Sequence, residues 1–169
     1  MSAHGLPLFL SMKILAIDPS VNNVGVAFYD TETEQLKTTC FHPKRNKDTT
    51  VLAVAKQIVS HLHLNGNGRG QVDAIVIEQP NWQGSTKGLI AMQQGYTLDL
   101  AFLVGYLSSW LWCPLTFLPT PMQWKGTVPK AATKKRVERR FGELQVSEHE
   151  YDAIGMIMWL LDSDKIKER

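Results

Sequence analysis

Three acidic residues and a histidine stand at positions suited to metal-dependent chemistry. Asp18 and Glu78 each end a short apolar run of the kind that forms a buried strand. His149 and Asp152 are three residues apart, which places them on the same face of a helix's first turn. A carboxylate at the end of a core strand is costly unless a cation meets it. The four side chains are therefore candidates for a shared site.

Such a set of side chains would bind hard divalent cations, and Mg²⁺ suits carboxylate ligands. Two ions about 3.5 to 4 Å apart activate a water and stabilise the leaving oxygen of a phosphodiester, which is the two-metal template for nucleases. In this scheme His149 serves either as an additional ligand or as a proton carrier.

The chain must bring these residues together from distant segments. Apolar runs and helical spacings predict strands at 13–17, 24–29, 34–41, 72–77 and 114–118, and helices at about 48–62, 89–112, 130–141 and from 148 onward. Asp48 is the expected cap of the first helix, and Ser147 with Glu150 matches the S-x-x-E capping box of the last. This order predicts an α/β fold with three antiparallel strands, two further strands and helices packed on the sheet. If the first and fourth strands are neighbours, Asp18 and Glu78 emerge side by side.

Composition is that of a single globular domain. The chain has 169 residues, 44% of them hydrophobic and 20% charged. We expect residues 1–11 to be an N-terminal extension and 12–169 to be one domain. Cys40 and Cys113 fit no metal-ligand spacing and are expected to be reduced thiols of a cytoplasmic protein. No run reaches the roughly 18 apolar residues of a membrane helix, and the opening residues lack the basic start of a signal peptide.

The charge is strongly uneven along the chain. Residues 125–140 hold seven basic residues and one acidic residue, a net charge of +6, whereas the whole chain carries +2. A basic segment of this kind favours a polyanionic partner, and nucleic acid is the commonest one. A solvated helix face is the alternative.

The ordered set of motifs resembles the RuvC-type Holliday-junction resolvases of the RNase H-like superfamily. It consists of IDPSVNNVGVAFYD with Asp18, AIVIEQP with Glu78, the basic region, and HEYDAIGMIMWLL with Asp152. The resemblance covers roughly Met12 to Leu161. It implies an RNase H-like mixed five-stranded sheet with helices on both faces, and a homodimeric endonuclease that nicks two opposing strands of a four-way DNA junction. Two Mg²⁺ ions per active site are implied, with Mn²⁺ as a substitute. Such a protein suits a bacterial cell or a phage-infected one.

The resemblance also suggests individual roles. Asp18, Glu78, His149 and Asp152 match the family's four catalytic positions in order, although many relatives carry Asp where this chain has His149. Lys125 and Lys134 resemble the family's functional lysines near the scissile phosphate. The loop after Glu78 resembles the one that probes the junction centre. Further DNA contacts are expected from that loop and from the basic segment: Trp82, Lys87, Lys130, Lys135, Arg136, Arg139 and Arg140.

Each assignment has a structural alternative. Asp18 can accept hydrogen bonds from the turn at residues 20–23, and Glu78 can pair with a nearby lysine. Asp152 can be an ordinary first-turn acid favoured by the helix dipole. Trp82 can pack on the following helix. At the level of the whole chain, the alternatives are a non-catalytic module that binds branched DNA and an actin-like or sugar-kinase-like ATP-binding domain.

Overall fold

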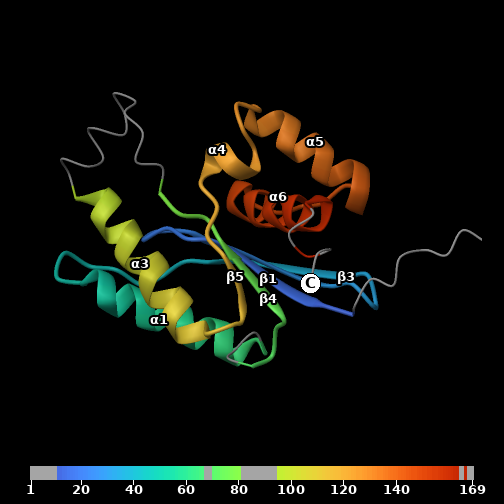
Figure 1. The fold of residues 1–169 in the computed structure, drawn as a ribbon. Coiled ribbons are helices and arrows are strands. Elements are labelled where there is room, and N and C mark those ends of the chain that lie inside the picture. Colours follow the sequence, from blue (N-terminus) through green and yellow to red (C-terminus); the bar gives the residue numbers. More distant parts are fainter. Residues whose placement is uncertain (1–10, 67–69, 81–94, 164–165, 167–169) are drawn as a thin grey trace, which may run out of the picture.

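The computed structural model describes residues 11–66, 70–80, 95–163 and 166. Its centre is a five-stranded sheet in the order β3-β2-β1-β4-β5 (Figure 1). The strands are β1 (Lys13–Asp18), β2 (Val24–Asp30), β3 (Gln35–Phe41), β4 (Ala74–Ile77) and β5 (Leu115–Phe117). The first three form an antiparallel meander, and β4 and β5 then add in parallel on the other side of β1. The predicted mixed sheet is confirmed.

Helices cover both faces of the sheet (Figure 1). They are α1 (Val51–Leu64), α3 (Tyr96–Leu111), α4 (Pro121–Trp124), α5 (Lys130–Phe141) and α6 (Glu148–Asp162). One core cluster joins α1 and α3 to the residues of the sheet that point toward them, and a second joins α6, α4 and α5 to the opposite face. Among the described residues, no helix is both long and apolar enough to cross a membrane.

Several predicted boundaries differ from the structure, most of them by one residue and three of them by more. Helix α1 begins after Thr50, whose hydroxyl accepts a hydrogen bond from the Ala53 N–H, and Asp48 is not its cap. The reason is a turn over residues 46–49, closed by the Thr49 N–H, which donates to the Asn46 carbonyl at 3.1 Å. Helix α3 begins only after Gly95, which has a φ of 77°; residues 89–94 lie outside the described part of the chain. Strand β4 begins at Ala74, two residues later than expected.

Candidate active site

Sheet register places two of the candidate acids next to each other. Strands β1 and β4 are parallel neighbours with Ile17 opposite Ile77, so Asp18 and Glu78 follow at the same edge. The ladder continues at that point, because the Glu78 N–H donates to the Ile17 carbonyl at 3.1 Å. The condition that Asp18 and Glu78 lie on adjacent strands is therefore confirmed.

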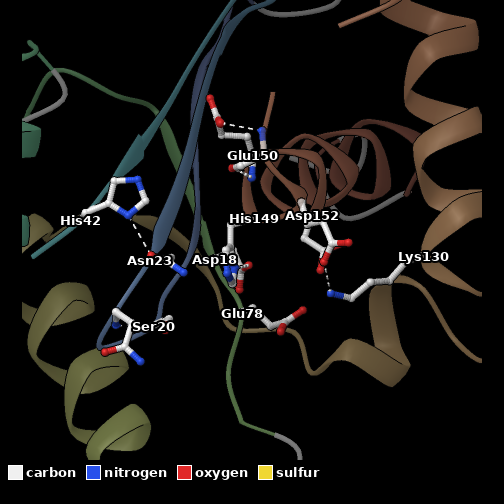
Figure 2. Close-up of polar contacts among 12 residues, drawn as sticks. Asp18, Ser20, Asn23, His42, Glu78, Lys130, His149, Glu150 and Asp152 are labelled. Atoms are coloured by element: carbon white, nitrogen blue, oxygen red, sulfur yellow. Dashed lines mark hydrogen bonds and ion pairs between the residues drawn. The ribbon is translucent and has the colours of Figure 1, made fainter. Parts of the chain in front are cut away.

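The alternation of side chains decides which face these acids occupy. Ile14 and Ala16 of β1, and Ala74 and Val76 of β4, belong to the core cluster under α6. Successive side chains of a strand point to opposite faces. Two residues further along, the side chains of β1 and β4 point to the α6 face again. The two carboxylates therefore point toward the helix that carries His149 and Asp152, and Figure 2 shows the four side chains close together.

The start of α6 is held by its capping box. The Glu150 N–H donates to Ser147 Oγ, and the Ser147 N–H donates to a Glu150 carboxylate oxygen at 2.9 Å. This cap fixes the first turn, from which His149 Nδ1 reaches Asp18 Oδ2 at 2.6 Å. The Asp18 carboxylate thus has a direct partner on α6.

Gly25 makes this docking possible. It lies on β2 directly opposite Asp18. A Cβ at position 25 would lie only 2.1 Å from the carbonyl oxygen of His149. Only a residue without a side chain allows the backbone of α6 to approach β2 this closely. The sequence interpretation gave Gly25 no such role, because the contact depends on a helix more than a hundred residues away.

Lys125 is the cation of the site. Its Nζ lies 3.1 Å from Asp152 Oδ2 and 3.9 Å from Glu78 Oε2, and all three side chains are less than a fifth exposed. The short helix α4, which ends at the preceding residue, places this side chain. The alternative that Glu78 pairs with a lysine is thus present in the structure, but the same lysine also joins Glu78 to Asp152.

Burial and mutual repulsion shift the acidity of the cluster. Burial raises the pKa of Glu78 to about 7; the charges of Asp18 and Asp152 add to this, while Lys125 and a hydrogen bond from Trp124 oppose it. Burial also raises the pKa of the Asp18 carboxyl against the opposing effect of His149. The Asp18 hydrogen bond in turn raises the pKa of His149. Perturbed pKa values of this kind cluster at functional sites, which makes these carboxylates candidate functional residues.

Trp124 is a member of the site that sequence reasoning missed. Its Nε1 donates to Glu78 Oε2 at 2.6 Å, and the residue is only 8% exposed. The neighbouring Lys125 was singled out because it resembles a functional lysine of the family. A tryptophan beside it carries no charge and has no spacing signal, so only the fold could identify it.

The basic helix α5 contributes unevenly. Lys130 pairs with Glu148 at 2.8 Å, and its pKa is raised chiefly by that contact, with smaller effects of Asp152 and Asp18. Lys134 instead lies 3.6 Å from Glu138 and over the ring of Tyr151. The structure therefore brings Lys130, rather than Lys134, toward the acids.

The remaining DNA-contact candidates lie on the outer surface of α5 or outside the described residues. Arg140 pairs with Asp162 at 3.2 Å. Lys135, Arg136 and Arg139 are exposed and form no ion pair with any other described residue. Trp82 and Lys87 fall in the segment 81–94, outside the described residues.

The donor set suits a hard divalent cation, because it consists of the buried or nearly buried carboxylates of Asp18, Glu78 and Asp152. Within the described part of the chain, however, no three His, Cys, Asp or Glu side chains are gathered closely enough to form a ready-made metal site. In this arrangement Lys125 and His149 supply the partners of the carboxylates.

Comparisons with known proteins place the fold. No protein-family model matches the chain, and no curated protein matches its sequence. Among solved structures, it is similar to T. thermophilus RuvC in complex with a Holliday junction substrate, with a TM-score of 0.58 and 16% sequence identity over 88% of this chain and 92% of that one. The chain therefore has a RuvC-like, RNase H-like fold.

Proposed function

We propose that this protein is a metal-dependent DNA endonuclease that resolves four-way junctions by paired symmetric nicks. The observation that carries the proposal is the convergence of Asp18, Glu78 and Asp152 on one face of a RuvC-like sheet, with Lys125 between two of them. One structural neighbour is a RuvC bound to a Holliday junction substrate. The exposed basic residues of α5 supply a surface for phosphates.

The three carboxylates are the proposed ligands of two Mg²⁺ ions, with Mn²⁺ as a substitute and His149 as a further ligand or a proton carrier. When bound, such ions activate the attacking water and stabilise the leaving oxygen. Asp18 and Glu78 come from rigid neighbouring strands, and Asp152 comes from a capped helix. The chain therefore needs little rearrangement of its backbone to hold this donor set.

His149 is oriented for proton transfer. Asp18 holds its Nδ1 at 2.6 Å, and no described residue bonds its Nε2. The side chain is about one third exposed. The ring can therefore pass a proton through Nε2 to a leaving strand while Asp18 fixes its orientation.

Lys125 is the proposed partner of the scissile phosphate. In the structure its ammonium group balances Glu78 and Asp152. When cations satisfy those carboxylates, the ammonium group becomes available for a phosphate oxygen, and Lys130 borders the same site.

Paired nicking requires two active sites, and α3 is the proposed dimer contact. Several of its apolar side chains are exposed, including Tyr96 at 54%, Leu98 at 62% and Phe102 at 42%. A second copy packed on this helix would cover them.

The test is cleavage of labelled four-way junctions, flaps and linear duplex, in Mg²⁺ and in chelator, with each cut mapped. The variant Asp18→Asn should bind the junction with unchanged affinity and lose at least about a hundredfold in nicking rate, because it removes one proposed ligand. Asp48→Asn is the matched control, since Asp48 is exposed and precedes α1, which packs on the opposite face of the sheet. Wild-type nicking by Asp18→Asn would refute the mechanism.

The same experiment separates a second candidate, a non-catalytic module that binds branched DNA. It is favoured by the ion pairs that Lys125 and His149 already make with the acids in this arrangement. Tight junction binding without nicking in Mg²⁺ or Mn²⁺ would support this module and exclude the endonuclease.

A further inference from the structure

Trp124 joins the two elements that carry the acids. Its indole Nε1 donates to Glu78 Oε2 at 2.6 Å, just beyond the end of β4. The six-membered side of the same ring lies on Gly155 of α6, where a Cβ would stand 2.7 Å from Cζ3 and 3.3 Å from Cη2. One flat, rigid side chain therefore spans from Glu78 to α6.

The ring is itself firmly held. The Thr120 hydroxyl accepts a hydrogen bond from the Gln123 N–H, and the Gln123 side chain accepts one from the Thr120 N–H, which closes a capping box around α4. The preceding segment is tied to the end of β4, because the Gln79 N–H donates to the Pro119 carbonyl at 3.0 Å. The backbone that carries Trp124 is thus fixed to the same strand that carries Glu78.

This connection matters because a glutamate side chain has three rotatable bonds that the sheet does not control. The Trp124 hydrogen bond fixes one oxygen of Glu78, and the other makes no hydrogen bond with a described residue. Gly155 lies three residues after Asp152, on the adjacent turn of α6. The position of the indole ring therefore sets the Glu78 carboxylate relative to Asp152.

We propose that Trp124, seated on Gly155, is a positioning residue that holds Glu78 in place for cation binding. This inference rests on the proposed function. Gly155 takes part in this positioning as well, because only a glycine at this place in α6 leaves room for the Trp124 ring. Removing a hydrogen-bond partner of a metal ligand typically lowers metal affinity or activity by about 10- to 100-fold.

The first test compares Trp124→Phe with wild type. Mn²⁺ affinity is measured by calorimetry on the DNA-free protein, and junction binding is measured in chelator. We expect about 10- to 100-fold weaker Mn²⁺ binding with unchanged junction affinity. Trp110→Phe is the matched control, because Trp110 is partly buried and packs against the core on the opposite face of the sheet. This variant should keep wild-type Mn²⁺ affinity.

Gly155→Ala provides a second test that retains the indole N–H. Alanine is the better helix former, so this variant has no intrinsic reason to unfold. The added methyl group must displace the ring, and a cavity of about 370 Å³ that both residues line gives the ring room to move. We expect Mn²⁺ affinity to fall in Gly155→Ala, and to fall no further when Gly155→Ala is added to Trp124→Phe.

The outcomes are distinguishable. If the wild-type protein neither binds Mn²⁺ nor nicks junctions, the proposed function fails and the inference fails with it. If the wild type does both while Trp124→Phe and Gly155→Ala keep its Mn²⁺ affinity, only the positioning role is refuted. Additive losses in the double variant would also refute it, because they would show that Gly155 does not act through Trp124.

Discussion

Replacing Lys125 with methionine should cost substantial stability when no divalent cation is present. The substitution keeps much of the aliphatic stem and removes the ammonium group that pairs with Asp152 at 3.1 Å and Glu78 at 3.9 Å. With an effective dielectric constant near 20, the two attractions amount to about 5 and about 4 kcal/mol before desolvation is subtracted. Breaking a buried pair by removing one partner typically costs about 3 to 5 kcal/mol.

For Lys125→Met we expect a loss of stability at the lower end of this range, about 3 kcal/mol. Glu78 has a pKa of about 7, so its carboxyl can take up a proton at neutral pH once the ammonium group is gone. A loss of about 3 kcal/mol corresponds to a fall in melting temperature of about 6 to 12 °C for a chain of this size. The assay is thermal and urea unfolding of Lys125→Met in chelator and in Mg²⁺. Magnesium should recover part of the loss, because it neutralises the carboxylates in place of the lysine.

Lys130→Met is the matched control. Lys130 forms a shorter ion pair, 2.8 Å to Glu148, but both side chains are more than 60% exposed. Exposed pairs contribute little because water and salt screen them. If Lys125→Met loses no more stability in chelator than Lys130→Met, the acids do not depend on Lys125 and the electrostatic reasoning is wrong.

Two further predictions concern packing and DNA binding. Gly25→Ala should lower the melting temperature by several degrees, because the added Cβ would meet the His149 carbonyl. The control is Gly105→Ala in α3, where an added Cβ meets nothing within 4 Å, and this variant should be neutral or stabilising. Equal melting temperatures of the two variants would contradict the close approach of α6. Replacing Lys134, Lys135 and Arg136 with glutamine should weaken junction binding and flatten its salt dependence by roughly 0.9 in the log–log slope per lost phosphate contact; an unchanged slope in a binding titration would place the DNA elsewhere.

The sheet and the convergence of the acids were predictable from sequence. Apolar runs gave the strands, and the order of elements gave the mixed topology confirmed by the strand pairing. The Ser147 capping box was also predictable, because both of its bonds are local. Asp48 and Thr50 are both good caps, and the choice between them depended on a turn over residues 46–49 that no periodicity indicates.

The supports of the site were not predictable in the same way. Trp124, Gly25 and Gly155 act through contacts between segments far apart in the chain. Sequence cannot tell which of these basic residues lies near the acids. Lys130 and Lys134 are four residues apart and share a face of α5. Lys130, one turn earlier, pairs with Glu148 at the start of α6, whereas Lys134 pairs with Glu138.

The close approach of Gly25 to the backbone of His149 also determines when the site can form. Asp18 and His149 are separated by 131 residues, so their contact closes a very long loop, and such contacts form late in folding. The N-terminal strands leave the ribosome before α6 is complete. While the ribosome still holds the last helix, the meander of β1 to β3 can assemble, but its carboxylate has neither the histidine nor Asp152 beside it. A growing chain therefore carries the acid without the partners of the candidate site.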